Sequence, residues 1–169
     1  PCLNVHPGDL TYERNGRRVL AGLHTIPIEN AIAEGHNSIR SSVIVAQPYS
    51  GSGSGDMDSG PVLGVSKPLE IEFLGHSRES LHNVLSQRPK QRPAGGFKDI
   101  LAEVAAENQE RLKKAGDWTV FPPVVRAFSE GRYALDEKGG LLWLGADASW
   151  QPVLTVEFGG GEAKPLKRR

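Results

Sequence analysis

Two side chains suited to chemistry stand close together near the start of the chain. Asn4 and His6 lie at the C-terminal end of a short apolar run, and Pro7 ends that run. Residues two apart on a strand point to the same face, so a strand here would place an amide donor beside a titratable imidazole. Open α/β folds hold their reactive groups at such strand ends. By itself an Asn-x-His pair carries little information, and its meaning depends on the rest of the chain.

A third candidate, Asp58, lies in a tight loop between two predicted strands. It is followed by Ser59, Gly60 and Pro61, a pattern that holds the backbone in a fixed turn. Taken alone, Asp58 is best interpreted as a turn residue. Beside an imidazole, a carboxylate favours the charged ring and orients it. The elements between His6 and Asp58 therefore decide whether the three side chains form a site.

The apolar pattern predicts the elements that position these side chains. They are a loop over Gly8–Gly22, a helix over Thr25–Glu34, a buried strand over Ser42–Ala46, an extended segment over Pro61–Phe73, helices over Ser77–Leu85, Phe97–Ala115 and Pro122–Gly131, and hairpin-like strands from Arg132 onward. The long helix is expected to end at Gly116 and the next one to start at the Pro122-Pro123 pair. This order predicts an α/β fold, an open twisted sheet with flanking helices. We expect a catalytic region over residues 1–133 and a small β extension with a basic tail over residues 134–169.

Composition limits the class of protein. The chain has 169 residues, with 20 Lys and Arg against 20 Asp and Glu. Its length suffices for one domain with a real core, and its zero net charge argues against nucleic acid or an anionic membrane as the main partner. Cys2 is the only cysteine, so neither a disulfide framework nor a cysteine zinc site is expected, and no apolar run is long enough to span a membrane. We expect a cytoplasmic protein without a metal centre.

The segments in their order resemble a known family. They are Asn4-Val5-His6-Pro7, Gly22-Leu23-His24-Thr25, a helix, a buried strand, Asp58-Ser59-Gly60-Pro61-Val62, and later Asn108-Gln109-Glu110, Phe121-Pro122 and Ser129-Glu130-Gly131-Arg132. This order resembles the C-terminal half of the 10-formyltetrahydrofolate-dependent formyltransferase family, to which glycinamide ribonucleotide transformylase and methionyl-tRNA formyltransferase belong. The resemblance covers Asn4 to about Tyr133.

The resemblance implies a formyltransferase of one-carbon metabolism. Its fold would be the C-terminal half of a formyltransferase-type open sheet, its catalytic residues Asn4, His6 and Asp58, and its formyl donor 10-formyltetrahydrofolate. The residues expected to bind the folate are Gly55, Asp56, Met57 and Asp58. The family's nucleotide-binding-like N-terminal half does not precede the Asn-x-His segment here, so we expect this chain to be part of a longer protein or to need that half from another chain.

The residue types suit formyl transfer on chemical grounds as well. An amine attacks the formyl carbon through a tetrahedral intermediate that bears an oxyanion. Asn4 can donate an amide N–H to that oxygen, which is a contribution of about 100-fold or more in rate. A protonated His6 would add positive charge or donate a proton. Asp58 can orient the ring and accept the amine's proton, directly or through water.

The chain departs from the family pattern in two loops. Asn-x-His is followed by Pro7-Gly8-Asp9-Leu10-Thr11 in place of a Ser-Leu-Leu-Pro-like run, and the longer loop after it carries Arg14, Arg17 and Arg18. Arg17 and Arg18, with His24, are candidates to bind a phosphate or carboxylate of the acceptor, although a solvated loop fits equally well. The Gly/Ser run over residues 50–55 lacks the spacing of a phosphate-binding loop, so we expect a mobile lid or linker.

Two other functions remain open. The same three side chains could direct water onto the formyl group, which would make the protein a formyltetrahydrofolate hydrolase. Alternatively the chain could be a non-catalytic half-domain that binds folate or assembles with another chain. The acceptor amine, whether small-molecule or tRNA-linked, is not identified by the sequence.

Overall fold

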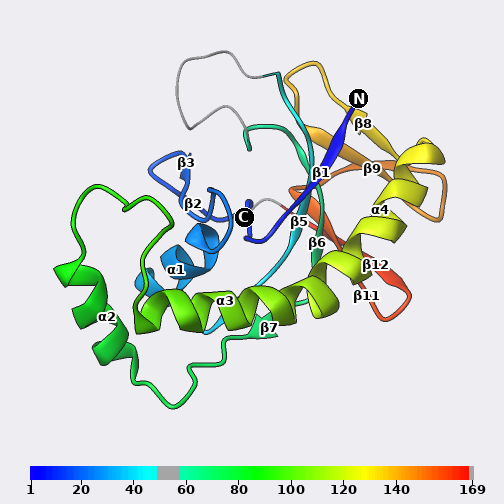
Figure 1. Cartoon of the computed structure of the whole chain (residues 1–169). Helices are drawn as coiled ribbons and strands as arrows, with labels where there is room; N and C mark the ends of the chain where they lie inside the picture. The colour runs from blue at the N-terminus through cyan, green and yellow to red at the C-terminus, as the bar shows by residue number, and fades with distance from the viewer. Residues whose placement is uncertain (49–57, 168–169) are drawn as a thin grey trace.

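A five-stranded mixed sheet forms the centre of the fold (Figure 1). The computed structural model describes residues 1–48 and 58–167. The strands, in spatial order, are β1 (Leu3–His6), β5 (Ser42–Val45), β6 (Val62–Ser66), β11 (Thr155–Gly159) and β12 (Glu162–Leu166). The β6–β11 pair is parallel and the other neighbouring pairs are antiparallel. The chain is therefore a mixed α/β protein, as its sequence predicts.

Three smaller sheets accompany the central one. They are β10–β9–β8, from Trp150–Pro152, Leu141–Leu144 and Tyr133–Leu135; β2–β3, from Glu13–Arg14 and Arg17–Arg18; and β4–β7, from Ser38–Ile39 and Leu69–Glu70. The β2–β3 hairpin lies within the segment that we expected to be only a loop. Its turn is Asn15-Gly16, both with positive φ, and this dipeptide is a typical two-residue hairpin turn.

The described residues form four α-helices. They are α1 (Ile26–Ala33), α2 (Arg78–Gln87), α3 (Ile100–Leu112) and α4 (Trp118–Ser129). Ser77 caps α2 and Asp99 caps α3, each accepting a backbone N–H with its side chain. Thr25 stands at the cap position of α1 but donates its hydroxyl to Glu29, at 2.6 Å. None of the helices in the described ranges is long and apolar enough to cross a membrane.

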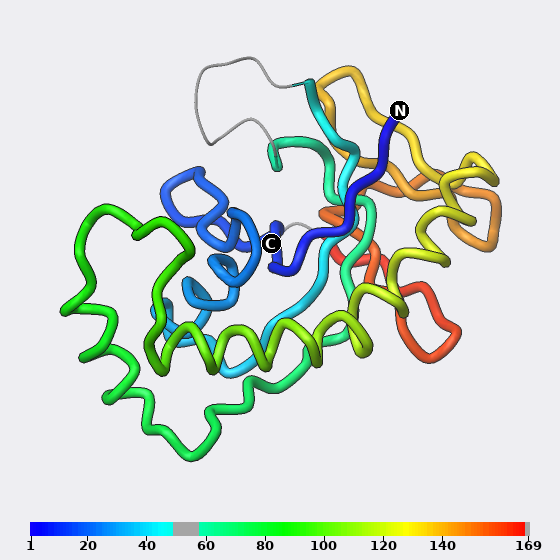
Figure 2. Tube along the Cα trace, viewed as in Figure 1, coloured from blue at the N-terminus to red at the C-terminus, as the bar shows by residue number. Residues whose placement is uncertain are grey.

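The sequence predicts that α3 and α4 are separated by a break at Gly116, and this prediction is wrong. Residues Lys113–Asp117 form a π-helical turn that joins α3 to α4, and the chain path runs on without a loop (Figure 2). Gly116 is buried in this turn and lies close to Ser41. A Cβ at this position would overlap the Ser41 hydroxyl, so a larger residue would not fit. Close packing, not helix termination, is what this glycine provides. Pro122 and Pro123 lie inside α4 instead of starting it.

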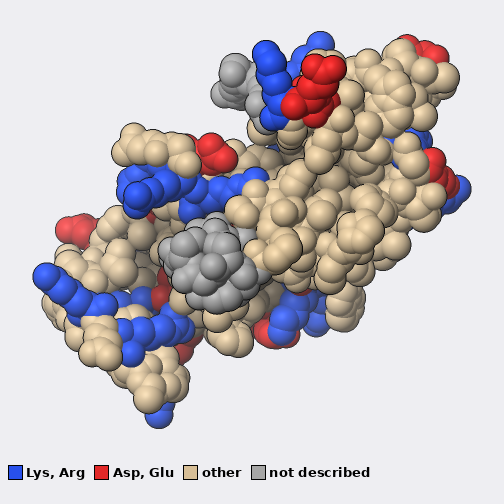
Figure 3. Space-filling model, turned by 90° about the horizontal axis from the view of Figure 1, so that it is seen from above, with Lys and Arg blue, Asp and Glu red and all other residues tan. Residues whose placement is uncertain are grey.

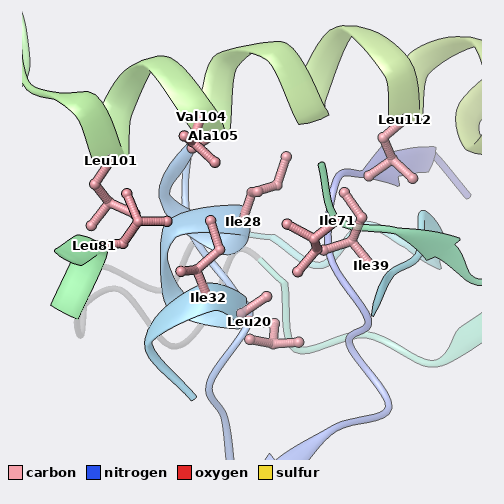
Figure 4. Packing of buried hydrophobic residues seen from close by; sticks show 11 residues of the cluster. Leu20, Ile28, Ile32, Ile39, Ile71, Leu81, Leu101, Val104, Ala105 and Leu112 are labelled. Atoms are coloured by element: carbon pink, nitrogen blue, oxygen red, sulfur yellow. The ribbon is translucent and has the colours of Figure 1, made fainter. Parts of the chain in front are cut away.

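The described residues form three hydrophobic cores. The smallest consists of Leu10, Ile44, Val62 and Val65, and the other two lie along the path of α3 and α4. The first is enclosed by α1, α2 and α3 and contains Leu20, Ile28, Leu81 and Leu101 (Figure 4). The second lies between the central sheet, α4 and β8–β10 and contains Val43, Val124, Trp143 and Phe158. Strands β11 and β12 come from the segment expected as a separate β extension, yet they pair into the same sheet as β1. The division near residue 133 stays a prediction.

The surface carries charges of both signs. On the face seen in Figure 3, Lys and Arg side chains are most frequent over the side of the molecule that holds α2 and the β2–β3 hairpin. Uncharged residues dominate the opposite side of this face, where α4 and β8–β10 lie. The basic residues thus gather near the segment that follows β1.

Candidate active site

The end of β1 brings His6 and Asp58 together. His6 is the last residue of β1, and its side chain is only 4% exposed. Its Nδ1 lies 3.5 Å from Oδ2 of Asp58, and its Nε2 lies 2.9 Å from the carbonyl oxygen of Leu20. The Asp58 side chain is 15% exposed, so the pair meets at a partly water-accessible point. Two of the three predicted catalytic side chains are therefore neighbours in space.

Both ring nitrogens of His6 face hydrogen-bond acceptors. A carbonyl oxygen can only accept, so the nitrogen at Leu20 must carry a hydrogen to form that bond. An ionised carboxylate also only accepts, so Nδ1 interacts favourably with Asp58 when it too is protonated. The imidazolium form is the one that satisfies both partners. The geometry thus fixes the orientation of the His6 ring between the carbonyl oxygen of Leu20 and the carboxylate of Asp58.

Asn4 is the third predicted member and lies on the same face of β1 as His6. It pairs with Ile44 of β5, whereas His6 pairs with Ser42. Its side chain is exposed, and within the described ranges its amide has no hydrogen-bond partner. The amide is thus available to a ligand oxygen. β1 is an edge strand, paired only with β5 among the described residues.

The turn after β1 is held by the hydroxyl of Ser42. Ser42 Oγ donates to the carbonyl oxygen of Gly8, at 2.7 Å, and accepts from the backbone N–H of Leu10, at 3.0 Å. Gly8 packs against the carbonyl of Leu20 and the His6 ring, where a side chain would not fit. These contacts give the segment over residues 7–11 a defined path.

Arg18 holds the loop that carries Asp58. Its Nη1 donates to the carbonyl oxygens of Asp58 and Gly60, the latter at 2.9 Å. Glu13 Oε1 lies 3.9 Å from Arg18 Nε. Burial lowers the pKa of Arg18 from its ordinary value, against the opposing charges of Glu13 and Asp58. Gly60 lies against the carbonyl of Val45 so closely that a Cβ would overlap it.

The residues expected to bind the acceptor or folate differ in whether the structure places them near His6 and Asp58. Arg17 and His24 are exposed, and within the described residues neither side chain contacts His6 or Asp58. Arg17 and Arg18 are consecutive strand residues and point to opposite faces, so they do not form one clamp. Gly55, Asp56 and Met57, and the Gly/Ser run over residues 50–55, lie outside the described residues.

A cavity of about 570 Å³ opens beside the Asp58 loop. Its lining is more polar than apolar and is formed by Leu10, Thr11, Glu13, Arg18, Ser59, Gly60, Pro61, Val62, Gly139, Leu141 and Leu154. Because Ser59 and Gly60 directly follow Asp58, a ligand in this cavity would lie next to the candidate site. No group of three or more His, Cys, Asp and Glu residues in the described ranges is placed to hold a metal ion.

Sequence reasoning missed two features of the site. The carbonyl of Leu20 is a backbone group, which no residue pattern reveals. Asp117 is the other: it lies in the π-helical turn and accepts from Ser41 Oγ at 2.5 Å. Burial raises the pKa of Asp117, against the smaller opposing effects of the Ser41 hydrogen bond and the charges of Lys113 and His6.

Comparison with protein-family models, curated proteins and solved structures finds no match for this chain in any of the three.

Proposed function

We propose that the chain carries the catalytic residues of a formyltransferase that moves a formyl group from 10-formyltetrahydrofolate to an amine. The observation that carries the proposal is the His6–Asp58 pair at the end of β1, 3.5 Å apart. Asn4 stands on the same face, and its amide has no hydrogen-bond partner among residues 1–48 and 58–167. An amide donor, an imidazolium and a carboxylate are together suited to acyl transfer between nitrogens.

Each side chain has a role in this proposal. The donor supplies an electrophilic formyl carbon. Asp58 accepts the proton that the attacking amine loses, directly or through one water molecule. Asn4 donates a hydrogen bond to the formyl oxygen as negative charge develops on it. His6, held between Leu20 and Asp58, supplies positive charge beside that oxygen and can return a proton to the departing nitrogen.

The open edge of β1 fits the expectation of a further half of the enzyme. Among the described residues β1 pairs with β5 alone, so its other edge can accept another strand. A nucleotide-binding-like half at that edge would cover Asn4 and complete the folate and acceptor contacts. It could come from the same protein or from another chain.

The decisive experiment replaces Asp58 with asparagine. Asp58→Asn keeps the size of the side chain and removes the base, so turnover is expected to fall about 100-fold or more while the fold survives. Asp147→Asn, in an exposed turn of the β9–β10 hairpin, is the matched control and should transfer at the rate of the unaltered protein. Transfer is measured with 10-formyltetrahydrofolate and candidate amines, and folding by circular dichroism. Near-normal turnover in Asp58→Asn would contradict the role of Asp58 as the catalytic base.

The same assay separates the alternatives. Free formate released without an acceptor amine identifies a hydrolase, with water as the nucleophile. Absence of folate binding in the complete protein identifies a non-catalytic role. Formylated amine identifies the transferase.

A further inference from the structure

Arg18 is a partly buried cation that donates hydrogen bonds to backbone groups. Its side chain is 19% exposed, and its Nη1 donates to the carbonyls of Asp58 and Gly60, which lie 40 and 42 positions further along the chain. Its ion-pair partner is Glu13, whose Oε1 is 3.9 Å from Nε and belongs to a side chain that is 53% exposed. Removing a cation from water is costly, so the two carbonyl bonds are the contacts that compensate the burial of Arg18.

The segment that carries Arg18 also holds His6. Leu20, two residues after Arg18, presents its carbonyl oxygen to His6 Nε2 at 2.9 Å. This segment is itself anchored, because Asn30 of α1 donates to the carbonyl of Val19 at 3.0 Å and the Leu20 side chain is 3% exposed in the first core. The anchored segment over residues 18–20 therefore forms hydrogen bonds with both the ring of His6 and the backbone of Asp58.

We propose that Arg18 is a positioning residue that sets the distance between His6 and Asp58. Among the described residues it forms no hydrogen bond or ion pair with the side chain of His6 or Asp58, and it holds Asp58 through the backbone carbonyl. Both bonds come from Nη1, whose two N–H groups are fixed in the plane of the guanidinium, whereas an ammonium binds as a flexible point charge. The effect on turnover rests on the proposed function; the effect on the His6–Asp58 geometry does not.

A direct role in binding an acceptor anion accounts less well for these contacts. Nη1 of Arg18 is already committed to two carbonyls, and Arg17 points to the other face of the hairpin. An anion bound by Arg18 would compete with the bonds that hold the loop. The two roles differ in what they do to kcat and KM, which makes them separable.

The test compares Arg18→Met and Arg18→Lys with Arg17→Met, the exposed neighbour, as control. The first readout is the ¹⁵N spectrum of the imidazole rings, in which His6 is assigned among the five histidines by its loss in His6→Gln. In Arg18→Met the His6 ring signals are expected to move toward those of Asp58→Asn, with the other histidine signals unchanged. Arg18→Lys should give an intermediate position and Arg17→Met no change. If Arg18→Met does not fold, Arg18→Lys decides the comparison.

The second readout is transfer kinetics in the complete protein. Misplacement of a catalytic group by about 1 Å can cost about 100-fold, so kcat is expected to fall by up to that factor in Arg18→Met, with KM for the acceptor changed less than about twofold. A raised KM with unchanged kcat would overturn the proposal in favour of an acceptor clamp. Unchanged His6 signals in a folded Arg18 variant would overturn it as well. If Asp58→Asn proves fully active, the proposed function fails, and the ring spectra still decide the role of Arg18.

Discussion

At the residue scale, the His6–Asp58 pair depends on the small residue beside it. Gly8 lies two residues after the strand end, and its backbone N–H donates to the carbonyl of His6 at 2.9 Å. A Cβ at this position would overlap the carbonyl oxygen of Leu20 and come within 3.1 Å of His6 Nε2. Those two atoms form the hydrogen bond that fixes the ring. Gly8 is therefore required for space at the site.

Gly8→Ala should disturb both stability and the His6 ring. Overpacking a well-filled site costs about 1–3 kcal/mol, so the free energy of unfolding in urea is expected to fall by that amount. The methyl group must displace Leu20 or the imidazole, so the His6 ring signals should shift. Gly35→Ala is a control for substitution itself, because a Cβ there meets nothing within 4 Å, although its positive φ adds strain. An unshifted His6 signal in Gly8→Ala would contradict the packing described here.

At the element scale, the sequence predicts those helices and strands whose positions follow from the local spacing of apolar residues. Helix α1, helix α2 and strand β5 lie where apolar spacing places them, within one or two residues of the expected ends. The π-helical turn is different, because it depends on Gly116 fitting against Ser41, far away in the sequence. The site divides in the same way. Residue types and order indicate His6 with Asp58, whereas the Leu20 carbonyl and the Arg18 contacts arise only when distant segments pack.

The π-helical turn makes a prediction about pH. Burial raises the pKa of Asp117 above its ordinary value of 3.8, so the folded state binds this proton more tightly than the unfolded state. The ionised carboxylate therefore destabilises the fold at neutral pH, and this cost disappears below pH 3.8. Asp117→Asn can still accept from the Ser41 hydroxyl, so it should stabilise the protein at pH 7. The gain should shrink as the pH falls toward 3.8.

Urea unfolding of this variant at pH 7, 5 and 4 measures the trend. Asp147→Asn is a control of opposite sign, because hydrogen bonds from Ser149 lower the pKa of Asp147. Its carboxylate stabilises the fold above pH 3.8, and that contribution is lost as the pH falls through the lowered pKa. Asp147→Asn should therefore lose stability at pH 7. A gain in Asp117→Asn that stays constant with pH would refute the assigned cause.

At the scale of the whole molecule, the two larger cores and the central sheet bring N-terminal and C-terminal segments of the chain into contact. The first core depends on α1, α2 and α3, and the second joins α4 and the central sheet to β8–β10. Strand β6 is central because it pairs with β5 on one side and with β11 on the other. The candidate site on β1 and the C-terminal strands thus share one sheet. The helical path of α3 and α4, which bends where the two join, runs along both cores (Figure 1).

Removal of residues 134–169 tests whether the C-terminal strands are an appendage or part of this fold. The deletion takes five buried side chains from the second core: Leu141, Trp143, Val153, Val156 and Phe158. At about 1.5–3 kcal/mol for each large buried side chain, the loss is roughly 8–15 kcal/mol, which equals the whole stability of an ordinary domain. It also exposes the edge of β6, a strand whose residues are all buried, to pairing with other chains. We therefore expect residues 1–133 alone to aggregate or to lack cooperative unfolding by circular dichroism. A soluble fragment with a sharp urea transition and native His6 ring signals would instead establish residues 1–133 as an independent domain.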